Sequence, residues 1–330
     1  MTDKLKFPAP YFGGKAMIAD KVWAALGQPK QYMEPFFGSG AVLLARPNFD
    51  PTKYYEIICD ADGFIANVWR ALQAAPDEVA KVCDWPINHA DLSARKRKLI
   101  ASEKRLLENL IADDKWYDVE AAGYWIWAAS CWIGSELTKI GQIPHLAGNH
   151  GINALGQIPR LAGNRGINAL GQIPHLTGNK GVQEPYNTGI YTWFRELSER
   201  LRYVKVVCGD WTRICGGNWQ DRNPPVGIFF DPPYGTEAGE RDENIYQVDS
   251  VTVAHDVREW SIKRGSNPNY RIVIAGYGEH EELKAHGWTS IAWSAQGGYS
   301  KIGKGENNNR HKETLWLSPH CLKNKTLFDN

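Results

Sequence analysis

QYMEPFFGSGAVLLARP, residues 31–47, indicates the fold more clearly than any other stretch of the chain. It combines a short apolar run, a turn containing Gly38 and Gly40, and an apolar segment that begins a helix. YYEIICDAD at 54–62 is β-branched and aromatic and ends in acidic residues, and the helical pattern GFIANVWRALQAA follows at 63–75. This order of strand, glycine-rich turn, helix, strand, acid and helix is typical of the first half of a doubly wound nucleotide-binding sheet.

The same alternation of helices and strands resumes in the C-terminal part of the chain. An amphipathic helical pattern leads into a strand followed by Asp210, and VGIFF at 226–230 predicts a buried strand. A helix near 253–264 and the strand YRIVIAG at 270–276 follow. Because the alternation stops near Pro86 and restarts near residue 186, we predict one α/β domain with an inserted middle region.

The middle region contains a repeat of 15 residues, with copies at 141–155, 156–170 and 171–185. Each copy has an I-P-x-L piece and a G-N-x-G turn, which predicts short extended strands joined by turns. Arginine reads base edges and contacts phosphates, so one hypothesis is that Arg160 and Arg165 bind DNA. A duplicated surface loop or a dimer contact explains the repeat equally well.

Composition restricts the classes of function. The net charge is +1 over 330 residues, so any surface that binds DNA must be local. The basic runs at 95–105 and 301–312 are candidates, although a solvated helix or loop face is the commoner explanation of such runs. The six cysteines form no C-x-x-C pair or zinc-type cluster, and no apolar stretch resembles a signal peptide or membrane span. We therefore expect no metal, no membrane contact and a cytoplasmic location, in a bacterium or a phage-infected host.

The tetrapeptide Asp231-Pro232-Pro233-Tyr234 directly follows the predicted buried strand. The amino group of adenine is a poor nucleophile until acceptors draw on its two N–H groups. The Asp231 carboxylate would accept one N–H and the Pro232 carbonyl the other, while the prolines hold the turn and lack competing N–H donors. Tyr234 would stack on a base that has left the duplex. A proline turn that only closes the strand is the alternative explanation.

Glycines and acids elsewhere fit a nucleotide ligand. Gly38 and Gly40 would let a ligand approach the backbone at the start of a helix. Asp60 and Asp210 each follow a predicted strand, where a carboxylate can hold ribose hydroxyls. Taken singly, each acid is equally well explained as a helix cap or a turn former.

Together these motifs resemble the Dam-like DNA adenine-N6 methyltransferases of the alpha group, in particular their phage-type members. The order is Y-F-G-G-K at 11–15, E-P-F-F-G-S-G at 34–40, Asp60, C-G-D-W at 208–211 and finally D-P-P-Y at 231–234. The resemblance implies that S-adenosylmethionine is surrounded by Tyr11, Lys15, Glu34, Phe36, Gly38, Gly40, Asp60, Asp210 and Trp211. It further implies that Asp231, Pro232, Pro233 and Tyr234 hold the target amine, with Asn309 and Arg310 near the flipped base.

The fold that this resemblance implies is a Rossmann-like methyltransferase sheet flanked by helices. Residues 1–85 would be the first, cofactor-binding part of the catalytic domain, 86–185 the inserted target-recognition region, and 186–330 the second catalytic part. The implied reaction transfers a methyl group from S-adenosylmethionine to N6 of adenine in double-stranded DNA by base flipping, without a metal.

Three alternatives accompany this reading. A catalytically silent DNA-binding protein could retain the same fold. Methylation of cytosine N4 is less favoured because that group usually has Ser in place of Asp231, and methylation of an RNA adenosine is a third alternative. A monomer and a homodimer are both compatible with the sequence. Restriction-modification is a common setting for the family, but no residue indicates a partner endonuclease.

Overall fold

The computed structural model describes residues 5–9, 11, 15–86, 88–131, 188–233, 252–276, 278–293 and 313–323. The chain divides into two compact units, a first at 1–14, 60–210 and 244–247, and a second at 15–59, 211–243 and 248–330. The period-15 repeats, with Arg160 and Arg165, lie outside the described residues. The predictions of short strands and of DNA contacts in the repeats therefore stay predictions.

The second unit is built on a sheet. Its strands are β1 (Gln31–Glu34), β2 (Tyr55–Asp60), β4 (Val226–Phe230), β5 (Tyr270–Gly276), β6 (Thr289–Ala292) and β7 (Thr314–Leu317). Its helices are α1 (Ala19–Leu26), α2 (Ala41–Leu44), α9 (Thr212–Cys215), α10 (Val253–Gly265) and the 3-10 helices η2 (Trp219–Arg222) and η4 (Gly278–His286). The strands follow one another in the order β2-β1-β4-β5-β7-β6. β1 is parallel to β2 and β4, and β4 is parallel to β5, whereas β7 is antiparallel to both β5 and β6.

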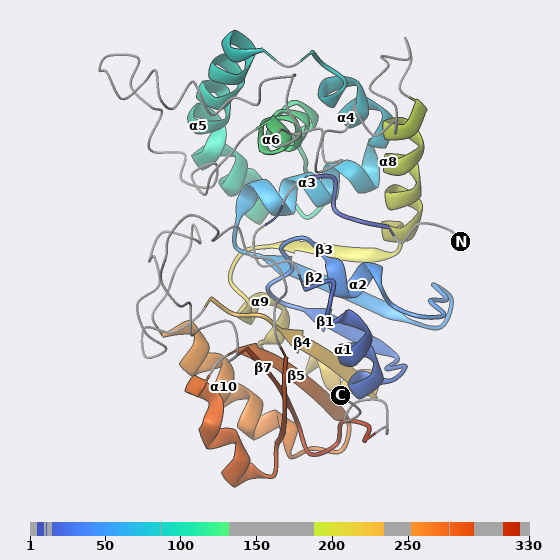
Figure 1. Cartoon of the computed structure of the whole chain (residues 1–330), viewed down its shortest axis with the longest axis vertical. Coiled ribbons are helices and arrows are strands. Elements are labelled where there is room, and N and C mark those ends of the chain that lie inside the picture. The colour runs from blue at the N-terminus through green and yellow to red at the C-terminus, as the bar shows by residue number, and fades with distance from the viewer. Residues whose placement is uncertain are drawn as a thin grey trace, which may run out of the picture. The chain divides into compact units, whose positions relative to one another are not determined.

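Helices cover both faces of this sheet. A side chain at Gly227 would lie against Leu26 of α1. Because successive side chains of a strand point to opposite faces, Phe230 points to the other face, where it contacts Trp260 of α10. Figure 1 shows α1 and α10 on either side of strands β4 and β5. Every residue of β4 is buried, which explains why this strand reads as the continuous apolar run VGIFF.

The strand order creates a switch point between β1 and β4. From β1 the chain continues to β2 on one side, and from β4 it continues to β5 on the other. In an open α/β sheet, ligands bind beyond the carboxyl ends of the strands where the order reverses. The register pairs Met33 with Ile228, so the turn after β1 and the turn after β4 emerge at the same edge.

The first unit is largely helical. It contains α3 (Gly63–Ala74), α4 (Pro76–Cys83), α5 (His89–Ala112), α6 (Val119–Cys131), α8 (Thr188–Leu201) and strand β3 (Val204–Cys208). Helices α4, α5 and α6 pack against α3, as Figure 1 shows within this unit. The buried guanidinium of Arg70 on α3 donates hydrogen bonds to the carbonyls of Leu110, Asp113, Trp116 and Val206. This one side chain therefore ties the end of α5 and strand β3 to α3.

The structure confirms the predicted α/β class with a Rossmann-like sheet flanked by helices. Strands predicted at 54–62, 226–230 and 270–276 correspond to β2, β4 and β5. Helix α4 was not predicted, although Pro76 stands at its first turn, where proline is favoured. The division into 1–85, 86–185 and 186–330 concerns the roles of these segments and stays a prediction. Among the described residues, no helix has the length and apolar character that crossing a membrane requires.

Candidate active site

The glycine turn after β1 has a backbone that favours glycine. Gly38 and Gly40 have φ angles of 47° and 61°, in the left-handed region. The N–H of Gly40 donates to the carbonyl of Phe37 at 2.8 Å, which closes the turn. The N–H of Phe37 donates to the carbonyl of Cys59 at 3.0 Å, so the turn is fastened to the end of β2.

Glu34 fastens the other side of this turn. Its side chain is buried and accepts hydrogen bonds from the hydroxyl of Tyr32, at 2.7 Å, and from the backbone N–H of Leu43. Burial raises the pKa of the Glu34 carboxyl well above its usual value, and the charge of Asp231 raises this pKa further. Glu34 thus connects the end of β1 to the single-turn helix α2 across the turn. It was predicted as a site residue from its motif and not from this structural role.

Asp231 follows β4 at the same edge and forms an ion pair with Lys15. The ammonium nitrogen of Lys15 lies 3.0 Å from Oδ2 of Asp231. The two side chains are only 6% and 17% exposed, so the pair is shielded from water. Pro232 and Pro233 are buried, whereas Tyr234 lies outside the described residues. The ion pair gives the Asp231 carboxylate a defined orientation.

Aromatic rings surround the last residue of β4. The ring of Phe230, directly before Asp231, lies 6.3 Å from that of Phe36 in the glycine turn and 6.0 Å from that of Trp211. Phe36 and Trp211 were both predicted to contact the cofactor. The second unit therefore brings three predicted motifs together around Phe230.

The first unit holds the two remaining acidic residues that were predicted for the site, Asp60 and Asp210. The N–H of Gly209 donates to the carbonyl of Asp60 at 2.8 Å, so the residues that follow β3 lie beside Asp60. The side chain of Asp60 is half-buried and accepts the N–H of Asp62, whereas Asp210 is exposed. Asp62 caps α3 by accepting the N–H of Phe64, and burial together with the charge of Asp60 raises its pKa to about 7.

The predicted site residues fall into three groups. Nine predicted residues of the second unit lie at or beside the carboxyl ends of β1 and β4. They are Lys15, Glu34, Phe36, Gly38, Gly40, Trp211, Asp231, Pro232 and Pro233. The first unit holds Tyr11, whose ring lies edge-on to Phe7 at 5.8 Å, together with Asp60 and Asp210. Tyr234, Arg160, Arg165, Asn309 and Arg310 lie outside the described residues.

The basic run at 95–105 is less available to DNA than its sequence indicates. Arg95 and Lys96 are buried. The guanidinium of Arg95 lies 4.4 Å from the ring centroid of Trp127 and 4.7 Å from that of Tyr124. These two cations therefore belong to the helical core and do not form a DNA-binding face.

Sequence reasoning missed three residues around the site. Tyr32 lies two residues before Glu34, and this spacing places both side chains on one face of a strand, so a local signal existed. Asp62 had the signature of a helix cap. Trp260 belongs to no motif, and only the packing of α10 places it beside Phe230. No group of three or more His, Cys, Asp or Glu side chains within the described ranges could hold a metal ion.

The fold is that of a Rossmann-like α/β protein, and predicted site residues of three motifs gather near the switch point of its sheet. Residues 11–120 match the family model described as D12 class N6 adenine-specific DNA methyltransferase. This match confirms the predicted family, the adenine-N6 DNA methyltransferases, over the third of the chain that it covers. No curated protein matches the chain. The matched segment includes the glycine turn and Asp60 and ends before Asp231, so the role of Asp231 is argued from the site itself.

Proposed function

We propose that the chain is an S-adenosylmethionine-dependent enzyme that methylates N6 of adenine in duplex DNA. One observation carries the proposal. The Asp231 carboxylate, held by Lys15, and the turn containing Gly38 and Gly40 follow adjacent parallel strands and emerge at the same edge of the sheet. A methyl donor and an amine held by these two turns would be neighbours.

The residues fit S-adenosylmethionine. This ligand carries a purine, ribose hydroxyls and a cationic sulfonium, which suit aromatic rings, a hydroxyl-binding carboxylate and an acidic environment, respectively. The half-buried ring of Phe36 beside the glycine turn can contact the purine. The half-buried carboxylate of Asp60 can accept ribose hydroxyls. When bound, S-adenosylmethionine supplies an electrophilic methyl group whose sulfur leaves as a neutral thioether.

Asp231 and the Pro232 carbonyl would bind the target amine. Each accepts one N–H of adenine N6, which orients the nitrogen lone pair toward the methyl carbon and increases its nucleophilicity. The new bond joins N6 to the methyl carbon as the bond from that carbon to sulfur breaks, its electron pair staying on sulfur, and one N6 proton then passes to water. Because neither proline has an N–H, no backbone donor competes for these acceptors. Catalysis then depends on holding the two atoms at about 3 to 3.5 Å.

Lys15 would keep the Asp231 carboxylate in place during this step. Its ammonium group contacts Oδ2 at 3.0 Å, and its side chain is nearly inaccessible to solvent. A fixed carboxylate does not have to reorient when the base arrives, so the acceptor is ordered before the reaction. Lys15 and Asp231 are far apart in the sequence, and their ion pair would allow the N-terminal and D-P-P-Y motifs to serve one site.

Duplex DNA as substrate requires the adenine to leave the stack. Tyr234, next to the described turn, would stack on the extruded base. Asn309 and Arg310 would contact the base or its phosphates, and Arg160 and Arg165 would contact DNA outside the flipped nucleotide. These roles, and the target-recognition role of 86–185, are parts of the proposal.

Methyl transfer to defined substrates tests the proposal. The wild type, Asp231→Asn and a control, Asp50→Asn, would be incubated with labelled S-adenosylmethionine and duplex DNA, single-stranded DNA or RNA, and the nucleosides identified by mass. Asp50 forms an exposed ion pair with Lys53, so its variant changes a carboxylate away from the switch point.

We expect N6-methyladenine in duplex DNA from the wild type and the control. Asp231→Asn should lower the rate by about 100-fold or more, since it removes an oriented charged acceptor. N4-methylcytosine as product, methylation of RNA alone, or an unchanged rate in Asp231→Asn would contradict the proposal. Binding of S-adenosylmethionine without any transfer would favour a catalytically silent DNA-binding protein.

A further inference from the structure

Three aromatic rings form a closed triangle behind the Asp231 turn. The ring centroids of Trp211 and Phe230 are 6.0 Å apart, those of Trp211 and Trp260 are 6.2 Å apart, and those of Phe230 and Trp260 are 5.7 Å apart. The interplanar angles are 82°, 87° and 71°, so every pair packs edge to face. Such pairs have a preferred geometry, and three mutual contacts restrict the orientation of each ring.

The triangle joins two site motifs to a helix that has none. Phe230 is the last residue of β4 and directly precedes Asp231, while Trp211 belongs to C-G-D-W. Trp260 lies on α10, which packs on the face of the sheet opposite α1. Phe230 is fully buried and Trp211 nearly so, whereas Trp260 is half-buried.

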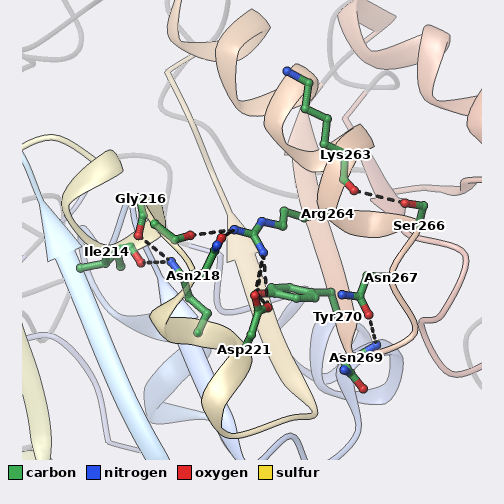
Figure 2. A network of polar contacts seen from close by, with 12 residues as sticks. Ile214, Gly216, Asn218, Asp221, Lys263, Arg264, Ser266, Asn267, Asn269 and Tyr270 are labelled. Atoms are coloured by element: carbon green, nitrogen blue, oxygen red, sulfur yellow. Dashed lines mark hydrogen bonds and ion pairs between the residues drawn. The ribbon is translucent and has the colours of Figure 1, made fainter.

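Trp260 is itself in contact with Arg264. The guanidinium of Arg264, one helical turn later, lies 5.8 Å from the Trp260 ring centroid. Arg264 also donates to Asp221, Asn218 and Gly217, and Tyr270 donates to the same Asp221 carboxylate. Figure 2 shows Arg264 between Asn218, Asp221 and Tyr270. The loop before β4 and the start of β5 thus anchor the residue that supports Trp260.

We propose that Trp260 is a positioning residue for methyl transfer, acting through Phe230 and Trp211 on the Asp231 turn. Lys15 holds the Asp231 carboxylate, and the ring triangle fixes Phe230, the residue before Asp231. The inference rests on the proposed function for its catalytic consequence. Its structural consequence, a defined position of Asp231 relative to Lys15, is independent of that function.

Three variants test the positioning role. Trp260→Leu keeps an apolar side chain but removes the ring, and Trp260→Phe retains a ring that can pack edge to face. Trp316→Leu is the control, because Trp316 is also a tryptophan of the second unit and is more deeply buried than Trp260, but it lies on β7, separated from β4 by β5. Each would be assayed by single-turnover methyl transfer to duplex DNA, with KM for S-adenosylmethionine and Kd for DNA measured separately.

A misplacement of about 1 Å in a reacting group can slow a reaction by about 100-fold. We therefore expect Trp260→Leu to slow single-turnover transfer by about 10- to 100-fold while Kd for DNA changes less than about twofold. Trp260→Phe should restore the rate to within about threefold of the wild type. Trp316→Leu should lower thermal stability but transfer at the wild-type rate once corrected for folded protein.

A second measurement reads the position of Asp231 without activity. The coupling between Lys15→Met and Asp231→Asn in a double-mutant cycle should fall to less than half its wild-type value in the Trp260→Leu background. It should be unchanged in the Trp316→Leu background. An unchanged coupling in Trp260→Leu overturns the inference, whether or not the wild type methylates adenine. Equal slowing in Trp260→Phe and Trp260→Leu, or in Trp316→Leu, overturns it as well.

Discussion

Replacing Lys15 by methionine would leave the Asp231 carboxylate without its cation in a shielded position. The two charged atoms are 3.0 Å apart, which corresponds to a gross attraction of about 5 to 6 kcal/mol at an effective dielectric constant of about 20. Desolvation of the two ions opposes this attraction, so the pair itself stabilises the protein by less. Breaking a buried pair costs about 3 to 5 kcal/mol. Because the Asp231 side chain is 17% exposed, we expect Lys15→Met to lose about 3 kcal/mol of unfolding free energy.

Urea unfolding of four proteins at neutral pH measures this loss. The four are the wild type, Lys15→Met, Asp231→Asn and the double variant. Each single change leaves one buried partner, whereas the double variant leaves no charge to neutralise. We expect the double variant to lose less stability than the sum of the single losses, with a coupling of about 2 to 3 kcal/mol.

The exposed pair between Lys53 and Asp50 provides the control. Its ammonium and carboxylate groups are 2.8 Å apart, but the Lys53 side chain is 70% exposed, so the same cycle should show no measurable coupling. A coupling below about 0.5 kcal/mol for Lys15 and Asp231 would refute the reasoning. The two motifs would then share an edge of the sheet without a shared electrostatic site.

Three further predictions concern the glycine turn, a buried histidine and the helical unit. Gly40→Ala should destabilise the protein by about 1 to 3 kcal/mol and weaken S-adenosylmethionine binding in calorimetry, because the new Cβ would lie 2.4 Å from the Phe37 ring at a φ of +61°. Gly217→Ala, at a similar φ with open space around it, should cost only the backbone strain, and equal effects of the two variants would refute the prediction. Burial lowers the pKa of His280 to about 4. As the pH falls, the unfolded chain therefore binds a proton near pH 6.5, before the folded chain does. The free energy of unfolding should fall by about 2 kcal/mol from pH 7.5 to 5 relative to a His280→Asn variant. Parallel pH profiles of these two proteins would contradict it. Arg70→Met should leave buried carbonyls without their donor, cost about 2 to 4 kcal/mol and raise hydrogen exchange at the end of α5, whereas wild-type exchange there would show that Arg70 does not hold it.

The elements around the site were predictable because their signals are local. VGIFF is a continuous apolar run because β4 is covered on both faces. The turn contains glycines because its backbone has positive φ angles. The order of the motifs along the chain indicated the family, and the match at 11–120 bears this out. Periodicity, turn chemistry and motif order are properties of short segments, so the sequence carries them directly.

Pairings between distant segments were not predictable in the same way. Nothing in the residues around Lys15 indicates Asp231 as its partner, since Lys15 precedes α1 and the contact depends on the packing of α1 against β4 and β5. The same holds for Arg46 and Glu56, a fully buried ion pair at 3.0 Å that joins the residues after α2 to β2. Trp260 likewise meets Phe230 only because α10 packs on the sheet. Tertiary packing decides which charges and rings meet.

The burial of charged residues was also misjudged from sequence. Arg95 appears within a basic run, yet its guanidinium packs between aromatic rings of the helical core. Arginine can be buried when aromatic rings pack against its guanidinium and a carbonyl accepts its hydrogen bond. Arg95 donates to the carbonyl of Val82 at 3.1 Å, which completes that environment.

The most direct test of the proposed reaction is sequencing that detects modified bases. It would be applied to DNA from cells that express the chain or its Asp231→Ala variant. We predict N6-methyladenine at one short recurrent sequence in cells with the wild type and none above background in cells with the variant. Equal adenine methylation in both, or methylation only at cytosine, would contradict the assignment of Asp231 to the target amine of adenine.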